Sequence, residues 1–304
     1  MTTIAIVGPG AVGGIVAAWL AQNAAHAVTL CARSPLTDLV VTTPDGFITA
    51  APRVVLDPAG IAAPADWALV ATKAYDVAST ANWLRALVAP HTRVAVLQNG
   101  VEHRERFAHL LPADRIVPAV VDIPANRTAP GRVTQHVYGT IVVPEGPDGD
   151  DFVELFAHTK IAVAADPDFR SCAWRKLCLN SAGAVSALTL AATGPRWSAE
   201  LETLIRAVVE ECAAVGRAEG AVIPADVIQS VIDGARKSSG AGGVNSLEAD
   251  RLAGRPLEID ARNGAIVRMG QKHGIPTPMN ALLVTLLDAS GSPRERLERH
   301  APAR

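Results

Sequence analysis

The feature that most constrains the fold is a glycine-rich segment near the N-terminus, Gly-Pro-Gly-Ala-Val-Gly-Gly at residues 8–14. It follows a short apolar run at residues 3–7 and opens a second apolar segment at residues 11–21. This order of strand, glycine turn and helix, with the spacing G-x-G-x-x-G, is typical of a dinucleotide-binding loop. The alternative is a glycine-rich turn in another kind of α/β domain.

Each glycine of the motif has its own physical reason. Gly8 permits a tight turn out of the strand, Gly10 lets the backbone approach a pyrophosphate, and Gly13 lets the helix pack close to the strand. The N–H groups at the start of the helix then face the phosphates, and the helix dipole favours their negative charge. We therefore expect the cofactor to be bound by Gly8, Pro9, Gly10, Ala11, Val12 and Gly13.

The rest of the chain divides into two halves of different character. In the first half, strand-like runs at residues 27–32, 67–72 and 92–97 alternate with helix-like segments at 74–88 and 102–111. This alternation predicts a mainly parallel, doubly wound sheet. Further strands at 116–123, 131–136 and 140–143 are expected as mixed or antiparallel strands at the edge of that sheet. A short helix at 152–159 and a last strand at 161–164 follow.

Beyond a turn at residues 166–168 the pattern is helical throughout. We expect helices at 170–190, 199–219, 225–235, 245–252, 258–273 and 278–288, with a flexible loop at 239–243 and a helix stop at Gly274 before Pro276. The sequence thus predicts an α/β N-terminal Rossmann-type domain at residues 1–167, which binds the dinucleotide. An all-α C-terminal domain at 168–304 follows and carries the substrate and catalytic residues.

Bulk composition excludes several other classes. The chain of 304 residues has a formal net charge of −2 and no run of Lys and Arg, so we expect no nucleic-acid partner. No apolar run reaches the roughly 18 residues that a membrane helix needs, so we expect no membrane association. The cysteines, Cys31, Cys172, Cys178 and Cys212, show no metal-ligand spacing. We expect no metal and a cytoplasmic protein, and an Ala-rich helical half is compatible with a homodimer.

Three polar residues follow predicted strands of the first half. The strand at 27–32 leads to Arg33, without the Asp or Glu that binds a ribose 2′-hydroxyl in NAD enzymes of this fold. Arg33 suits a 2′-phosphate, so we predict NADP(H) as the cofactor. The alternative is a solvated loop arginine in an enzyme that does not discriminate. Lys73 and Asn99 also end strands, where ligands gather in open α/β sheets; the alternatives are a surface lysine and an ordinary Asn-Gly turn.

In the second half, the stretch Trp-Arg-Lys-Leu-Cys-Leu-Asn at residues 174–180 stands out. Lys176 and Asn180 are four residues apart, so a helix places them on one face. On an otherwise apolar helix, these two side chains must face water, each other or a ligand. The alternative to a ligand site is a solvated helix face.

In these motifs, the chain resembles the ketopantoate reductase (2-dehydropantoate 2-reductase) family over nearly its full length. The resemblance rests on the glycine loop, Thr-Lys-Ala-Tyr-Asp at 72–76, Leu-Gln-Asn-Gly at 97–100, the stretch at 174–180 and the stretch at 246–260. It implies an NADP-dependent oxidoreductase that reduces a 2-keto acid to a 2-hydroxy acid. The reaction implied is the reduction of 2-dehydropantoate to pantoate in pantothenate biosynthesis.

The resemblance also implies roles for individual residues. Lys176 corresponds to the catalytic lysine, a general acid toward the substrate carbonyl. Glu258 corresponds to the active-site glutamate, close to that lysine and to the nicotinamide. Asn180 and Ser246 correspond to substrate-binding positions, and Asn99 to one that contacts both substrate and cofactor. Arg33 and Lys73 correspond to contacts with the adenosine phosphate and the cofactor backbone.

Some alternatives stay open. Ser246 is also a residue that commonly caps a helix, and Glu258 has the place of an acid that stabilises a helix dipole. The family commonly carries a second asparagine one turn after Asn180, where this chain has Ala184. The loss of a polar partner can change substrate preference strongly. There are therefore two competing hypotheses. One is a related NADP-dependent dehydrogenase for another small keto or hydroxy acid, and the other is a non-catalytic nucleotide-binding regulator.

Overall fold

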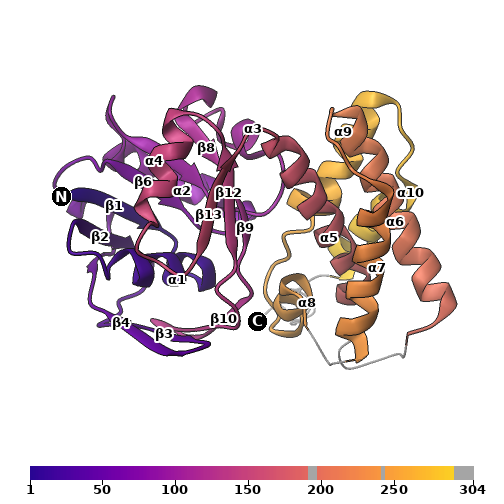
Figure 1. The fold of residues 1–304 in the computed structure, drawn as a ribbon, viewed down its shortest axis with the longest axis horizontal. Coiled ribbons are helices and arrows are strands. Elements are labelled where there is room, and N and C mark those ends of the chain that lie inside the picture. Colours follow the sequence, from indigo (N-terminus) through magenta and orange to yellow (C-terminus); the bar gives the residue numbers. More distant parts are fainter. Residues whose placement is uncertain (191–196, 241–243, 291–304) are drawn as a thin grey trace, which may run out of the picture. The chain divides into compact units, whose positions relative to one another are not determined.

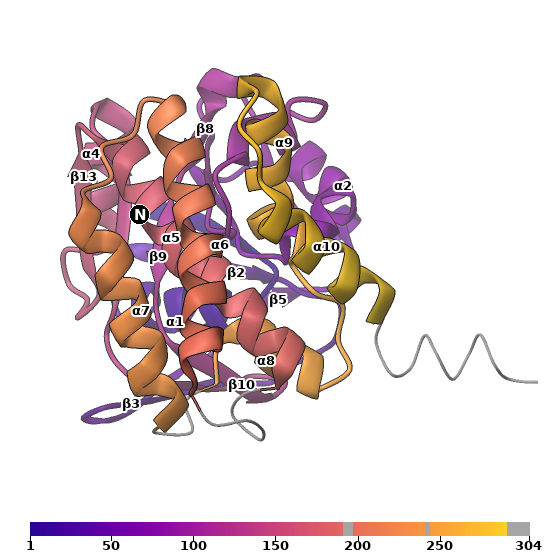
Figure 2. The same ribbon diagram turned by 90° about the vertical axis from the view of Figure 1, so that its right-hand side faces the viewer.

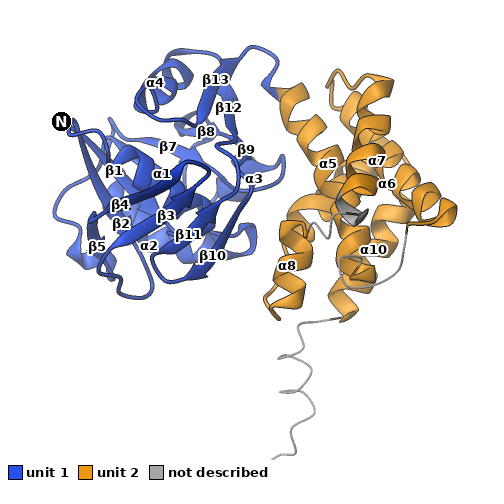
Figure 3. Ribbon diagram, turned by 60° about the horizontal axis from the view of Figure 1, so that its bottom comes forward, with its two compact units in different colours: residues 1–169 blue, residues 170–304 orange. Residues whose placement is uncertain are grey.

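The protein is described here by a computed structural model that covers residues 1–190, 197–240 and 244–290. The chain forms two compact units, residues 1–169 and residues 170–304 (Figure 3). The first unit contains the β-strands, and the second contains helices (Figure 1).

The main sheet of the first unit is parallel. Its strands are β1 (Thr2–Val7), β2 (His26–Cys31), β5 (Arg53–Val55), β6 (Trp67–Val70), β7 (Arg93–Val96) and β8 (Ile116–Pro118). They lie in the order β5-β2-β1-β6-β7-β8, and every neighbouring pair is parallel. Counted in the order of the chain, this is the 3-2-1-4-5-6 arrangement of a Rossmann sheet. The predicted Rossmann-type fold is confirmed.

Both faces of this sheet are buried. On β1, Ile4 and Ile6 pack into a core with α1 (Ala11–Leu20), whereas Ala5 and Val7 pack into a second core with α2 (Val77–Leu87). A strand buried on both faces has no polar face, which is why residues 4–7 of β1 and the whole of β6 are apolar. The sheet is therefore a rigid platform whose strand ends can hold a site.

Two smaller sheets complete the first unit (Figure 1). One has the order β10-β11-β3-β4, with its strands at Ala125–Ala129, Arg132–Gln135, Leu39–Thr43 and Gly46–Ala50. The other has the order β13-β12-β9, at Ala162–Asp166, Thr140–Pro144 and Val120–Asp122. The expectation that the strands at residues 116–143 extend the edge of the main sheet is therefore wrong beyond β8. The run at 116–123 breaks at Ala119, because β8 pairs with β7 and β9 pairs with β12.

The remaining helical segments of this unit are short. They are η1 (Pro58–Gly60), η2 (Ala74–Asp76), α3 (His103–Phe107), η3 (Ala113–Arg115) and α4 (Pro147–Leu155). The helix predicted at 102–111 is limited to α3. The helix predicted at 152–159 begins five residues earlier, at Pro147, because proline is favoured in the first turn of a helix.

The second unit is helical, as predicted. It contains α5 (Phe169–Thr189), α6 (Ala199–Ala218), α7 (Ala225–Gly240), α8 (Ser246–Leu252), the π-turn η4 (Asp260–Gly264), α9 (Ala265–His273) and α10 (Pro278–Ser290). Helix α6 contacts α7, α9 and α10 (Figure 2). Gly274 ends α9 in the left-handed conformation, with φ +67°. Of the loop predicted at 239–243, Ser239 and Gly240 belong to α7, and residues 241–243 lie outside the described residues. In the described part of the chain, no helix has the length and apolar character needed to cross a bilayer.

Candidate active site

The glycine loop lies where the strand order of the main sheet reverses, between β1 and β6. Gly8 has φ +90°, and a Cβ atom there would lie 2.7 Å from Thr72 Cγ2. A Cβ atom at Gly13 would lie 2.4 Å from the Gly8 carbonyl oxygen. These two glycines are required by the fold itself, because the chain segments after β1 and β6 approach each other so closely.

Gly10 differs from the other two glycines. A Cβ atom at Gly10 would meet only the Gly8 carbonyl oxygen, at 4.0 Å. Gly10 is also the N-cap of α1, and no side chain caps this helix end. The helix therefore offers backbone N–H groups and open space to an anion at the crevice where α/β sheets bind dinucleotides. The residues of the loop fit a dinucleotide pyrophosphate.

The ends of β6 and β7 are joined by polar contacts. The Gln98 side-chain amide donates to Thr72 Oγ1 at 3.0 Å and to the Lys73 carbonyl at 3.3 Å. His103 Nε2 donates to the Gln98 carbonyl at 2.9 Å. Burial lowers the pKa of His103, so its ring is neutral at pH 7. This network fixes the backbone on which the predicted residues Lys73 and Asn99 stand.

Sequence reasoning missed Gln98 and His103 as positioning residues. A sequence signal for Gln98 existed, because it is the residue before Asn99 in the Leu-Gln-Asn-Gly turn. The sequence gives no sign of His103, whose role depends on its burial in the folded unit. Both partly exposed residues, Lys73 and Asn99, follow strands at the same edge of the sheet as the glycine loop.

Arg33 follows β2 at this edge as well. Its Nη2 lies 3.2 Å from Asp76 Oδ2, and the Arg33 side chain is 81% exposed. An exposed ion pair of this kind is worth little in stability. Arg33 therefore remains accessible to an anionic ligand, with a carboxylate as its neighbour.

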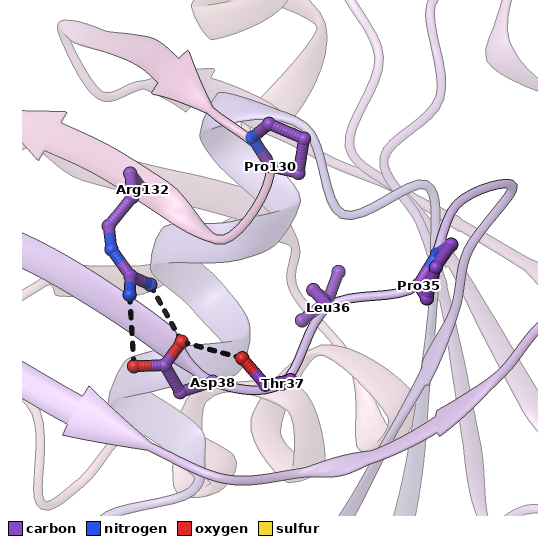
Figure 4. A pocket seen from close by; sticks show the side chains of 6 residues that line it. All are labelled: Pro35, Leu36, Thr37, Asp38, Pro130 and Arg132. Carbon is purple, nitrogen blue, oxygen red and sulfur yellow. Dashed lines mark hydrogen bonds and ion pairs between the residues drawn. The ribbon is translucent and has the colours of Figure 1, made fainter.

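A small pocket lies just beyond Arg33 in the chain (Figure 4). It has a volume of about 420 Å³, and its lining includes Leu36, Asp38, Pro130 and Arg132. The Arg132 guanidinium contacts both carboxylate oxygens of Asp38, at 2.9 and 3.1 Å, and lowers the pKa of Asp38. This two-point contact ties the segment after β2 to the start of β11. The lining contains no predicted site residue.

In the second unit, α5 presents the predicted catalytic lysine. Lys176, Asn180 and Gly183 are partly exposed and spaced four and three residues apart, so they form one stripe along the helix. Asn245 meets the end of this stripe, because its side-chain amide donates to the Gly183 carbonyl at 3.3 Å. Ala184 is fully buried. An alanine at position 184 offers no polar side-chain group to a ligand.

Ser246 opens α8 and is not its cap. The cap is Asn245, whose Oδ1 accepts from the backbone N–H groups of Leu247 at 3.0 Å and Glu248 at 3.1 Å. The capping alternative for Ser246 is therefore wrong. Ser246 is exposed, and its hydroxyl oxygen accepts a hydrogen bond of 2.8 Å from Arg262 Nη2.

Glu258 and Arg262 form a buried pair. Both side chains are 2% exposed, and Arg262 Nη2 lies 4.0 Å from Glu258 Oε2. Burial lowers the pKa of Arg262, while the carboxylates of Glu258 and Asp250 oppose this shift. Glu258 precedes the π-turn and is buried beside a guanidinium. It is therefore not an exposed acid that stabilises a helix dipole. Sequence reasoning missed Arg262, although the spacing of four residues from Glu258 signals a pair on one helix face.

Hydrogen bonds bring α5, α8 and the π-turn together within the second unit. The Asn263 side-chain amide donates to the Ser181 carbonyl of α5 at 3.2 Å and to Asn280 Oδ1 of α10 at 2.9 Å. Arg251 of α8 donates to the carbonyls of Ala187 and Leu188 near the end of α5. The segments that carry Lys176, Asn180, Ser246 and Glu258 are thus joined in one compact unit. Residues 1–190, 197–240 and 244–290 contain no cluster of His, Cys, Asp and Glu suited to a metal ion.

Comparison with known proteins gives the family. Residues 4–148 match the model of ketopantoate reductase PanE/ApbA, and residues 168–290 match that of its C-terminal part. The chain belongs to the ketopantoate reductase family. It is 54% identical over 290 residues to the 2-dehydropantoate 2-reductase of Caulobacter vibrioides. This match covers 95% of this chain and 99% of that protein.

Solved structures agree in fold. The crystal structure of 2-dehydropantoate 2-reductase from Geobacter metallireducens has a TM-score of 0.85 and 27% identity, and the match covers 95% of this chain and 99% of that one. D-mandelate dehydrogenase, solved with NADH and anilino(oxo)acetate, has a TM-score of 0.81 at 21% identity, over 94% of this chain and 97% of that one. The second likeness concerns the fold alone. The ketopantoate reductase family consists of nicotinamide-dependent oxidoreductases, and this chain is an enzyme of that family.

Proposed function

We propose that this chain reduces 2-dehydropantoate to pantoate, with NADPH as the hydride donor and Lys176 as the general acid. The observation that carries the proposal is that α5, α8 and the π-turn segment, the elements of these candidate residues, are hydrogen-bonded to one another in a ketopantoate reductase family member. The substrate is proposed from the relative in Caulobacter vibrioides, a 2-dehydropantoate 2-reductase.

The first unit is proposed to hold the dinucleotide. The pyrophosphate would lie over Gly10 and the uncapped start of α1, where a Cβ atom would meet open space. Pro9, Ala11 and Val12 complete the loop around it. When bound, the reduced nicotinamide supplies the hydride. Lys73 and Asn99 would contact the cofactor from the ends of β6 and β7.

NADP is preferred over NAD in this proposal because of Arg33. Its exposed guanidinium suits the 2′-phosphate, and no acidic residue directly ends β2. The Asp76 carboxylate shares that guanidinium at 3.2 Å, so it competes with a phosphate for the same charge. The preference for NADP therefore depends on how far Arg33 turns from Asp76 to the ligand.

Lys176 is proposed to act on the keto oxygen. Negative charge grows on that oxygen as the hydride reaches the keto carbon, and an ammonium group stabilises it and then donates the proton. Asn180 and Ser246 would bind the polar groups of the substrate. Glu258 would lie beside the reacting centre as a buried carboxylate paired with Arg262.

A cytoplasmic location is proposed because the cysteines are all free thiols, which suits a reducing compartment.

One observation favours a second candidate, the reduction of a different 2-keto acid. Ala184 is buried and replaces the second asparagine that the resemblance leads one to expect, so one polar contact to the substrate is lost. The test is steady-state oxidation of NADPH and of NADH by the purified chain. The substrates are 2-dehydropantoate, its analogue without the terminal hydroxyl group, and a panel of small 2-keto acids.

The proposal predicts the highest kcat/KM for 2-dehydropantoate with NADPH, at least about tenfold above the analogue without the hydroxyl group. Equal or better turnover of the analogue would favour the second candidate. Tight NADPH binding without turnover of any 2-keto acid would refute both and leave a nucleotide-binding regulator.

A further inference from the structure

Arg262 is among the largest fully buried side chains of the described chain. A buried guanidinium is costly unless charges and hydrogen bonds surround it. The contacts of Arg262 Nη2 are Ser246 Oγ at 2.8 Å and Glu258 Oε2 at 4.0 Å, and both residues are proposed above to act on the reactants. Its Nε group is also buried and has no hydrogen-bond partner. A buried donor without a protein partner is rare in folded proteins.

The backbone that carries Arg262 is itself unusual. Asp260–Gly264 is a π-turn, and such turns occur frequently at functional sites. The next residue, Asn263, anchors the turn to α5 through Ser181 and to α10 through Asn280. The guanidinium is therefore held in place by its backbone as well as by its own contacts.

The direction of the bond between Arg262 and Ser246 matters. Arg262 donates, so the Ser246 oxygen accepts and its own hydrogen points elsewhere. A hydroxyl that accepts from a cation becomes a stronger donor, because hydrogen bonds in series polarise one another. Ser246 is exposed, so this hydrogen is available to an oxygen of a bound ligand.

We propose that Arg262 is a positioning residue for the anionic substrate. It orients the Ser246 hydroxyl as a hydrogen-bond donor to the carboxylate of the 2-keto acid. This inference rests on the proposed function and adds to it a residue that reaches the substrate only through others.

The test is a double-mutant cycle between Arg262→Met and Ser246→Ala in the full chain, read as KM for the 2-keto acid with saturating NADPH. The loss of a charge-assisted hydrogen bond raises KM by about 10- to 100-fold in Arg262→Met. In the Ser246→Ala background, the same change raises KM by less than about threefold, because the contact through which Arg262 acts is already gone. Effects that multiply independently would overturn the proposal.

Two further variants separate positioning from folding. Arg268→Met removes another arginine close in sequence, whose contacts go to Asp260, at 2.5 Å to Oδ1 and 2.9 Å to the carbonyl, and it is expected to keep the wild-type KM. Arg262→Lys keeps the cation and is expected to have a KM between those of Arg262→Met and wild type. If Arg262→Met does not fold, the cycle is run with Arg262→Lys. A KM in Arg268→Met as high as in Arg262→Met, or no rescue by lysine, would overturn the proposal.

Turnover by the wild-type chain separates a failure of this inference from a failure of the proposed function. Wild-type turnover of a 2-keto acid with independent effects of Arg262 and Ser246 refutes this inference and leaves the proposed function intact. Absence of turnover with every 2-keto acid refutes both.

Discussion

Adding a single methyl group at Gly13 or at Gly10 separates what the glycine loop does for the fold from what it does for the ligand. A Cβ atom at Gly13 would lie 2.4 Å from the Gly8 carbonyl oxygen and 3.0 Å from Ala71 Cβ. The first contact is about 1 Å shorter than an optimal one. Backbone atoms must therefore move before alanine fits at this position.

The cost of Gly13→Ala follows from this overlap. Overpacking costs about 1–3 kcal/mol, and the better helix propensity of alanine returns up to about 1 kcal/mol. We expect a net loss of roughly 1–2 kcal/mol in the free energy of unfolding. For a unit of this size, that loss lowers Tm by roughly 2–8 °C.

Gly10→Ala is expected to leave stability nearly unchanged and to weaken NADPH binding. The nearest atom to a Cβ there is 4.0 Å away, and the backbone φ of −76° suits any residue. The free energy of unfolding should change by less than about 0.5 kcal/mol. The added methyl group stands where a pyrophosphate would approach the helix, so the Kd for NADPH should rise by about 10- to 100-fold, or about 1.4–2.8 kcal/mol.

The assay is thermal unfolding of each ligand-free variant beside titration calorimetry with NADPH. Gly13→Ala should lose Tm, and Gly10→Ala should lose affinity at an unchanged Tm. Wild-type NADPH affinity in Gly10→Ala would refute the placement of the pyrophosphate over this residue. A fall in Tm as large as that of Gly13→Ala would refute the claim that the space beside Gly10 is open.

Three further perturbations test separate parts of the account. Asp76→Asn removes the carboxylate that shares Arg33, so KM for NADPH should fall by about two- to fivefold while KM for NADH stays the same; an unchanged ratio of kcat/KM would contradict this competition. His103 is buried with a lowered pKa, so below about pH 6.5 the unfolded state binds a proton that the folded state does not. Stability should therefore decline as pH falls from 6.5 toward the folded-state pKa, by at most about 1.4 kcal/mol per pH unit, and His103→Gln should flatten that decline in urea unfolding curves. Ala184→Asn buries an amide in a closed site, so it should lower Tm without improving KM for 2-dehydropantoate; a gain in affinity would show that position 184 reaches the substrate.

The sequence predicts the parts of the fold that local patterns determine. Gly8, Gly10 and Gly13 are followed at once by their helix, and the main-sheet strands other than β5 lie in predicted apolar runs, so the Rossmann-type unit could be recognised. The short strand β5 was not predicted. The small sheets were not predicted. The hairpin of β3 and β4 is a local feature that sequence reasoning missed, whereas the pairing of β3 with β11 joins distant parts of the chain. Residues 116–123 form one apolar run, yet Ala119 separates a strand of the main sheet from a strand of another.

The candidate site shows the same division between local and distant information. Lys176 and Asn180 share a helix face by spacing alone, and the structure keeps them on one partly exposed stripe. Arg262 is charged and lies in a helix-like segment, so its sequence gives no reason to expect burial. In the structure Arg262 is buried and donates a hydrogen bond to Ser246, 16 residues away in the chain. Residues whose role comes from tertiary packing are the ones that sequence reasoning misses.

The central claim is that Lys176 delivers the proton during reduction of a 2-keto acid, and Lys176→Ala tests it most directly. The measurement is kcat for NADPH oxidation with 2-dehydropantoate, beside the Kd for NADPH. Arg175→Ala serves as the matched control, because this neighbouring cation of α5 donates to the Val222 carbonyl at 2.9 Å instead. The account predicts a kcat about 10²- to 10⁴-fold lower in Lys176→Ala, with NADPH affinity retained and Arg175→Ala close to wild type. A Lys176→Ala variant that keeps kcat within about threefold of wild type would contradict it, since general acid catalysis is worth far more than that.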